Sequence, residues 1–230
     1  MTSVLPKVRS WRPNCPPTWP NVWPKGCEPL PGRERGRMTM MQEFRKEGVL
    51  KDGTKVLLRP MVREDRDKLM DFFSRVSDLD RQFLRSDVHD PKVIDTWVNN
   101  IDYKKVFPLL AEVNGRIVGD ATLHMRRAGW KRHLGNVRVV VASDFQGRGL
   151  GTLLINEIAE LAGEFGLEKL VSEIYFNSPA AINAFKRAGF GVKAVFEDLV
   201  KDLYGNNIDM IVMVCDVEAR RDRLRGKGLA

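Results

Sequence analysis

The sequence is poor in the features that mark disulfide-rich, zinc-binding and membrane proteins. It has only three cysteines in 230 residues, Cys15, Cys27 and Cys215, which are too few and too far apart for a disulfide framework or a four-ligand zinc site. No run approaches the roughly 20 apolar residues that cross a bilayer, and the N-terminus has no apolar signal segment. We therefore expect a cytoplasmic protein with reduced thiols, no metal and no membrane partner.

The middle of the chain also lacks net charge. Of the overall charge of +8, residues 1–37 contribute +5 and residues 217–230 contribute +3, so residues 38–216 are neutral. A basic surface is the usual sign of a protein that binds nucleic acid. The neutral middle therefore argues against a nucleic-acid partner, although binding through the two basic ends stays open as a hypothesis.

The N-terminal segment has little capacity for regular structure. Eight of the twelve prolines fall between Pro6 and Pro31, interleaved with three tryptophans, and proline fits neither a helix interior nor a central strand. We predict a disordered extension over residues 1–45. It can be interpreted as a docking or RNA-contacting arm, or as a dispensable segment ahead of an internal start between Met38 and Met41.

Hydrophobic patterning predicts one mixed α/β domain over residues 46–216, followed by a basic C-terminal tail over residues 217–230. The Asn114-Gly115 pair suits a type I′ turn and predicts a hairpin. The order of elements predicts a sheet that begins antiparallel and then takes one helical crossover. The predicted strands are 54–59, 106–113, 117–125, 134–142, 169–176 and two around 204–207, and the predicted helices are 64–75, 91–100, 150–165 and 179–188.

A glycine-rich turn carries the clearest functional signal. The run Gln146-Gly147-Arg148-Gly149-Leu150-Gly151 joins a strand that ends in three valines to the next helix. Glycines let successive backbone N–H groups converge, and the N-terminus of the helix adds partial positive charge, so a phosphate fits there. Arg148 can add a cation.

Two common nucleotide-binding motifs do not match this turn. A Walker loop needs Lys-Ser/Thr after its last glycine, whereas Leu150-Gly151-Thr152 stands here. A dinucleotide fingerprint spaces its glycines as G-x-G-x-x-G after a first strand, whereas the three glycines here alternate and follow a hairpin. The turn therefore predicts a phosphate site of another kind.

These residues resemble the GCN5-related N-acetyltransferase (GNAT) family. The family's pyrophosphate loop, Gln/Arg-x-x-Gly-x-Gly/Ala, is matched by Gln146, Gly149 and Gly151, and its companion motif is matched by Asn177, Ala181, Phe185 and Gly189-Phe190. The likeness covers about residues 54–213. Within the family, the stretches Arg59-Pro60 to Glu64-Asp65, Ile101-Asp102-Tyr103, Gly115 to Gly119 and Val139 to Gly151 look most like the catalytic domains of bacterial protein-lysine acetyltransferases.

The resemblance implies a GNAT fold over residues 46–216, with a mostly antiparallel central sheet and helices on both faces. It also implies an N-acetyltransferase that moves an acetyl or other acyl group from acetyl-CoA to an amine without a metal. The acceptor can be a protein lysine or a small molecule, and the chain can be a monomer or a homodimer. The alternative is a catalytically weak or inactive module that senses acyl-CoA.

The resemblance further assigns cofactor-binding residues. The backbone of the valine strand would pair with the pantetheine arm, and one of its N–H groups would face the thioester oxygen. Asn177 would contact the cofactor or cap the following helix, and Phe185 would pack beside the cofactor or in the core. The full predicted set is Val139, Val140, Val141, Gln146, Gly147, Arg148, Gly149, Leu150, Gly151, Thr152, Asn177 and Phe185.

The chain departs from its relatives at the acid and base. An acceptor ammonium must lose a proton before it attacks, but the glutamate that does this in lysine acetyltransferases corresponds to Asn136. The tyrosine that protonates the leaving thiolate in many relatives corresponds to Phe185. These two departures motivate the sensor alternative.

Two residues are predicted to replace the missing base. Strand alternation puts Glu173 on one face with Tyr175 and Asn177, so Glu173 can reach the cofactor cleft. His124 shares the polar face of its strand with Asp120 and Thr122, and its ordinary pKa of about 6.5 suits proton transfer. Glu173 is preferred for its position.

Overall fold

The computed structural model describes residues 43–81, 84, 86–88 and 90–226. Nearly all of the predicted N-terminal extension, residues 1–45, therefore lies outside the described residues. No helix in the described ranges is long and apolar enough to cross a membrane.

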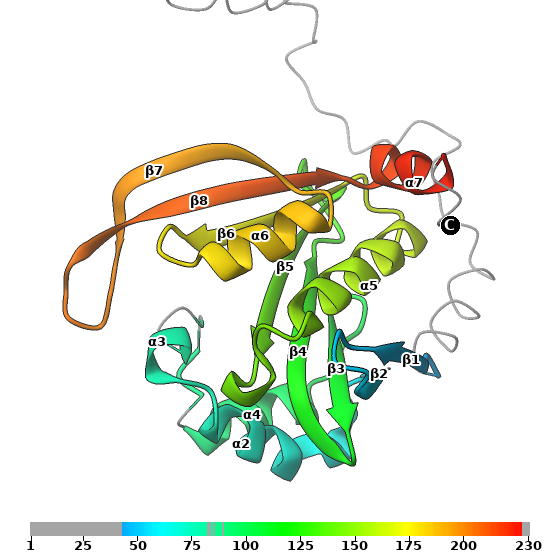
Figure 1. Cartoon of the computed structure of the whole chain (residues 1–230), viewed down its shortest axis with the longest axis vertical. Coiled ribbons are helices and arrows are strands. Elements are labelled where there is room, and N and C mark those ends of the chain that lie inside the picture. Colours follow the sequence, from blue (N-terminus) through cyan, green and yellow to red (C-terminus); the bar gives the residue numbers. More distant parts are fainter. Residues whose placement is uncertain (1–42, 82–83, 85, 89, 227–230) are drawn as a thin grey trace, which may run out of the picture. The chain divides into compact units, whose positions relative to one another are not determined.

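The described residues form one eight-stranded sheet in the order β1-β2-β3-β4-β5-β6-β8-β7 (Figure 1). All neighbouring strands are antiparallel except β5 and β6, which are joined by the α5 crossover. The predicted mixed α+β fold is thus confirmed. The strands are β1 (Lys46–Val49), β2 (Lys55–Pro60), β3 (Val106–Val113), β4 (Arg116–Met125), β5 (Leu134–Val141), β6 (Lys169–Tyr175), β7 (Gly191–Lys201) and β8 (Asn207–Asp216).

Helices cover both faces of this sheet. Helix α5 packs on the face that buries Val118, Ala121 and Val137, and α2 and α4 pack on the opposite face around Leu110 and Ile117. Each helix turns an apolar stripe toward the sheet, which is why 3.6-residue periodicity predicted α5 well. The helices are η1 (Arg63–Asp65), α2 (Arg66–Ser74), α3 (Asp78–Arg81), α4 (Pro91–Asn99), η2 (Ser143–Phe145), α5 (Leu150–Glu164), α6 (Pro179–Arg187) and α7 (Val217–Arg225).

The β3–β4 hairpin confirms the turn prediction. Asn114 has φ of 51° and Gly115 has φ of 79°, and a type I′ turn needs positive φ at both central residues. The turn directs β4 back along β3, which fixes the register of the first half of the sheet.

Strands β5 and β6 separate soon after they meet. Their parallel pairing covers only Leu134–Asn136 with Lys169–Val171. Beyond Asn136, β5 stays paired with β4 and β6 stays paired with β8. The sheet therefore opens between β5 and β6.

The C-terminal segment differs from the predicted tail. Residues 217–225 form α7, which packs on the domain through Arg220. Arg220 donates from Nε to the Ala188 carbonyl at 3.0 Å and from Nη2 to Asn156 at 3.1 Å, and it also pairs with Glu160. The reason is that a long basic side chain can be buried when each N–H finds an acceptor.

A buried ion cluster ties β2, η1 and β3 together. Arg59 donates from Nη1 and Nη2 to the two Asp65 oxygens at 2.7 and 2.6 Å, and from Nε to Glu112 at 2.8 Å. Arg59 is 7% exposed and Asp65 is 2% exposed. Burial alone would raise the pKa of Asp65, but the hydrogen bonds from Arg59 and the Val62 N–H outweigh it and lower that pKa.

We expect Asp65→Asn to lower the free energy of unfolding by about 3 kcal/mol, because it leaves the buried Arg59 guanidinium short of one counter-charge. Urea unfolding at pH 7 measures the loss. The matched control is Asp67→Asn, since the Asp67 side chain is 91% exposed and should cost less than about 0.5 kcal/mol.

Because the folded-state pKa of Asp65 is lowered, the difference in free energy of unfolding between wild type and Asp65→Asn should be fully present at pH values above the ordinary pKa of an aspartate. It should shrink as pH falls through the folded pKa. If Asp65→Asn and Asp67→Asn lost the same free energy of unfolding at pH 7, a stabilising role for the cluster would be contradicted.

Candidate functional site

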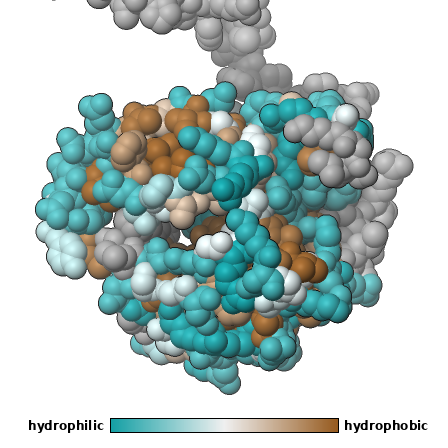
Figure 2. Space-filling model, in the orientation of Figure 1, coloured by the Kyte–Doolittle hydropathy of each residue, from teal (hydrophilic) through white to brown (hydrophobic). Residues whose placement is uncertain are grey.

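The space between β5 and β6 is the main cleft of the described structure. It has a volume of about 690 Å³ and is lined by β5, the loop that leads into α5, the start of α5, β6 and α6. Residues Val200, Lys201 and Met210 of the β7–β8 hairpin also reach its wall. Figure 2 shows this face hollowed between the part that carries the hairpin and the part that carries α2.

The glycine-rich loop forms one end of the cleft. Gly147 and Gly149 have φ of 72° and 94°, a left-handed conformation that side chains other than glycine rarely adopt. These two reversals bring the chain into the first turn of α5, whose leading N–H groups have no partner inside the helix. Gln146 braces the turn, because its Nε2 donates to the Val141 carbonyl at 3.3 Å and to Asp80 at 3.1 Å. The loop can therefore present backbone N–H groups to an anion.

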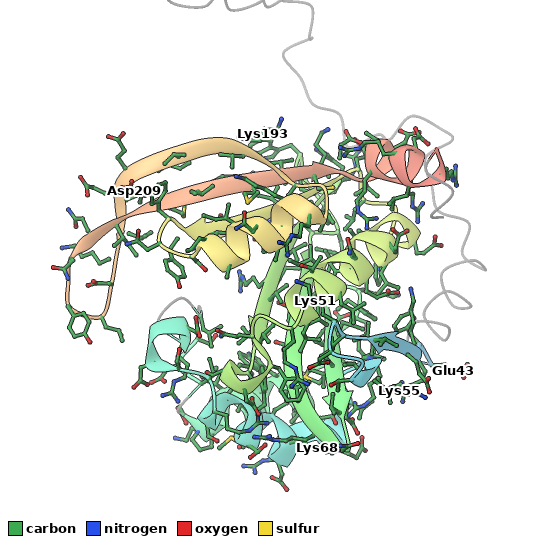
Figure 3. All side chains as sticks on the ribbon, viewed as in Figure 1. Glu43, Lys51, Lys55, Lys68, Lys193 and Asp209 are labelled. Carbon is green, nitrogen blue, oxygen red and sulfur yellow. The ribbon has the colours of Figure 1, made fainter. Side chains whose placement is uncertain are left out.

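The cation beside the loop is Lys51, and Arg148 is turned away. Lys51 lines the cleft, and its N–H donates to the Arg148 carbonyl at 3.2 Å. A Cβ on Gly149 would lie 3.3 Å from Lys51 Cγ, so the lysine stem packs against the loop. Figure 3 shows Lys51 near the start of α5.

The side chain of Arg148, which was predicted to add a cation to the site, makes its contacts outside the cleft. Its guanidinium pairs with Asp52, donates to Thr54 Oγ1 at 2.7 Å and lies 4.3 Å from the centre of the Phe145 ring. It is not among the cleft-lining residues. The contacts with Asp52 and Thr54 fasten the loop to the β1–β2 turn.

The three valines of β5 line the cleft as predicted. Val139 and Val141 pack against the core under α5, whereas Val140 packs against the core under α2 and α4. The strand therefore carries its backbone along the cleft between the two cores.

Phe185 and Asn177, the cofactor-binding residues predicted from the companion motif, have different surroundings. Phe185 is buried and lines the cleft. Its ring packs edge-on against that of Phe190, with 4.9 Å between the ring centroids. Asn177 is not among the lining residues, and the N-cap of α6 is Ser178. Neither predicted position of Asn177, in the cleft or at the N-cap, is therefore seen among the described contacts.

The structure brings one of the two predicted catalytic residues to the cleft. Glu173 lines it together with Tyr175, and Glu173 is exposed. His124 is not a lining residue; it faces Asn136 across the β4–β5 ladder, and its Nε2 lies 3.2 Å from Thr122 Oγ1.

Asp120 is the unusual titratable residue near the cleft. It faces Val140 across the β4–β5 ladder, and its Oδ1 is buried without a hydrogen-bond partner in the described ranges. Burial raises the pKa of Asp120 to about 7. The sequence placed Asp120 on a polar strand face but gave no sign of this burial, because α2 and α4 that cover the face lie far away in the chain.

Within the described ranges, no group of three or more His, Cys, Asp or Glu side chains is arranged to hold a metal. The cleft is instead lined by the glycine loop, apolar side chains of β5 and α6, and several basic residues, which are Lys51, Arg138, Arg187 and Lys201. This set is suited to a phosphate-bearing organic cofactor.

Comparison with known proteins finds acetyltransferases. Residues 73–190, just over half of the chain, match the acetyltransferase (GNAT) family. Acetyltransferase PA5475 of Pseudomonas aeruginosa is 29% identical over 133 residues, which cover 54% of this chain and 68% of that protein.

Solved structures give the same result. A GNAT-family acetyltransferase from Streptococcus pneumoniae matches with a TM-score of 0.61 and 25% identity over 69% of this chain and 98% of its own. The GNAT domain of S. lividans PAT matches with a TM-score of 0.63 and 23% identity over 75% and 96%. Other kinds of acetyltransferase match with TM-scores from 0.59 to 0.63, so the fold does not single out one acceptor.

We expect Asp120→Asn to be more stable than wild type at pH 8, and the advantage to shrink at pH 5. The pKa of Asp120 is raised from 3.8 to about 7 in the folded state, so ionisation costs more stability as pH rises between these values. The difference should change by about 2–3 kcal/mol between pH 5 and pH 8, at about 1.4 kcal/mol for each pH unit up to the folded pKa. Thermal unfolding of both proteins at each pH measures it, and a difference independent of pH would contradict the burial of this carboxyl.

Proposed function

We infer the function from one premise: the chain belongs to the acetyltransferase (GNAT) family, whose match covers just over half of its length. It is therefore an acetyltransferase that uses acetyl-CoA as the acyl donor. What the family leaves open is the acceptor amine. We propose that the acceptor is the side chain of a lysine in a protein.

The cleft between β5 and β6 is proposed to hold the acyl donor, and its border carries the proposal for the acceptor. In the proposed complex, the N–H groups of Gly147 to Thr152 hold the diphosphate of CoA at the N-terminus of α5, and Lys51 supplies the cation. The pantetheine arm follows β5 from Val141 toward Val139 and pairs with its free backbone edge. Phe185 packs against the other side of the arm.

One N–H group of the valine strand then faces the thioester oxygen. Such a donor stabilises the negative charge that develops when the amine attacks the carbonyl carbon. The reaction proceeds within a ternary complex, in which the amine displaces the CoA thiol directly. No covalent enzyme intermediate is required.

The surroundings of the cleft support a macromolecular acceptor. The β7–β8 hairpin that borders it exposes large apolar side chains, of which Leu199 is 55% and Tyr204 82% exposed. Contiguous exposed apolar residues commonly mark surfaces that bind other proteins. Glu173, exposed at the cleft, is placed to attract the ammonium group of an approaching lysine.

The likeness to the S. lividans PAT domain is compatible with this acceptor but has only 23% identity. The acceptor proposal therefore stands on the cleft and its border, and it needs a direct assay.

The direct test mixes the full chain with acetyl-CoA and three kinds of acceptor, and follows free thiol. The acceptors are peptides with one internal lysine and a blocked N-terminus, peptides with a free N-terminus and no lysine, and polyamines. We expect thiol release with the lysine peptides, with the acetyl group found on the lysine by mass spectrometry. Release only with the other two kinds would show a different acceptor, and no release despite CoA binding would favour the sensor alternative.

We also expect Lys51→Met to weaken acetyl-CoA binding about tenfold, because one charge-assisted contact with a phosphate is worth about 1.5 kcal/mol or more. Isothermal titration calorimetry measures it. Lys55→Met is the matched control, since Lys55 is exposed on β2 and does not line the cleft. Equal affinities for the two variants would show that Lys51 does not contact the cofactor.

A further inference from the structure

We propose that Asp120 is the general base of the reaction, which removes the proton from the acceptor amine. The role rests on the proposed function. It deepens that function by supplying the group that the family's usual glutamate position, occupied here by Asn136, cannot supply.

The strand register places Asp120 beside the reacting groups. Asp120 is directly opposite Val140 in the β4–β5 ladder, and side chains in such a pair have Cβ atoms about 4.5–5.5 Å apart on the same face. Val140 lines the cleft, and it belongs to the segment whose N–H groups are proposed to meet the thioester. Asp120 does not itself line the cleft, but its side chain lies next to that of Val140, which does.

The face on which Asp120 lies is the acceptor side of the sheet. Val140 packs with the core under α2 and α4, whereas its neighbours Val139 and Val141 pack under α5. With the loop at the start of α5 holding the diphosphate, the cofactor occupies the α5 side and leaves the opposite side for the amine. Glu173 and Tyr175 lie on this opposite face of β6, because Ser172 and Ile174 are buried beneath the other.

Among the described residues, the buried Oδ1 of Asp120 lacks a hydrogen bond, and no stabilising contact accounts for its burial. Nearly all buried polar atoms in proteins have a partner, and an unpaired buried carboxylate oxygen is destabilising. Oδ1 of Asp120 is buried and has none in the described part of the chain. The contrast with Asp65, whose two oxygens meet Arg59, shows that this fold satisfies a buried carboxylate where the carboxylate serves stability.

Asp120 also has a proton affinity suited to the task. Burial alone raises its pKa to about 7, and a general base is most effective when its pKa lies near the working pH. The other titratable or charged groups on this face are His124 on β4, Arg138 on β5, and Glu173 and Tyr175 on β6. Arg75 approaches from α2, where it is held by Asp71 and the Ile117 carbonyl.

Every proton and bond in the acyl transfer is accounted for by Asp120, the amine and the thioester. The acceptor ammonium gives one proton to the Asp120 carboxylate, and the amine nitrogen forms a bond to the thioester carbon as the carbonyl electrons move to oxygen. When the tetrahedral adduct collapses, the C–S bond breaks and the nitrogen's second proton goes to the departing thiolate. The products are the amide, free CoA thiol and protonated Asp120, which returns its proton to solvent.

The test compares Asp120→Asn, Asp120→Glu and wild type, using the lysine peptide and acetyl-CoA of the thiol assay. We expect Asp120→Asn to lower kcat about a hundredfold, with unchanged affinity for acetyl-CoA and an undiminished Tm. Asp120→Glu should keep part of the activity, because it retains a carboxylate. The wild-type kcat/KM should rise with pH through about 7, and Asp120→Asn should lose this rise.

Two further variants separate this role from others. Asp67→Asn, which is remote from the cleft, should match wild type, and Glu173→Gln should raise KM for the peptide while keeping the pH profile. Two results would overturn the role of Asp120 while leaving the proposed function intact. One is an active Asp120→Asn enzyme with the wild-type pH profile, and the other is a Glu173→Gln enzyme that loses this pH profile. Absence of thiol release by wild type with every amine would instead overturn the proposed function, and this role with it.

Discussion

The separation of β5 from β6 is the feature on which the rest of the site depends. Parallel pairing ends at Asn136 and Val171, so the backbone of β5 beyond this point has a strand partner only on its β4 side. Backbone N–H and C=O groups in the interior of a protein need partners. In the proposed complex the amide groups of the pantetheine arm supply them, so the cofactor would act as an additional strand of the sheet. The glycine loop is at the end of this opening because β5 leads directly into it.

Charged residues in this domain fall into two groups with different surroundings. Arg59 and Asp65 are buried and bonded to each other and, through Arg59, to the half-buried Glu112. Arg148 and Arg220 each meet several partners from distant segments. These residues hold β2, the loop and α7 in place. Asp120 is half-buried near the cleft, and its buried Oδ1 has no such partner in the described ranges. A carboxyl group in these surroundings is held near the point of ionisation, where it can exchange a proton readily but adds nothing to stability.

The sequence predicted most of the fold because its signals are local. The Asn114-Gly115 turn, the period of α5 and the glycines between β5 and α5 each depend on a few consecutive residues, and the structure has all three. The features that could not be predicted depend on contacts between distant segments. Lys51 meets the loop across almost a hundred residues, Arg148 is drawn away by Asp52, and Asp120 is buried by helices that precede its strand. Strand alternation placed Glu173 at the cleft but also favoured Asn177, because the alternation ends where β6 ends at Tyr175.

The acceptor is the hardest property to obtain from this sequence, and the structure explains why. In the proposed complex, the loop and the valine strand contact the diphosphate and the pantetheine arm of the cofactor, so they would not distinguish one amine from another. Selection of the amine depends on the border of the cleft, where the β7–β8 hairpin contributes Val200, Lys201 and Met210. This hairpin is interrupted by two register shifts, and one of them lies between Phe196 and Val200. Such irregularities re-aim side chains, so the surface that would contact a protein substrate follows from strand register and not from a motif. Binding energy gained there, away from the reacting atoms, can hold the acceptor nitrogen in line with the thioester.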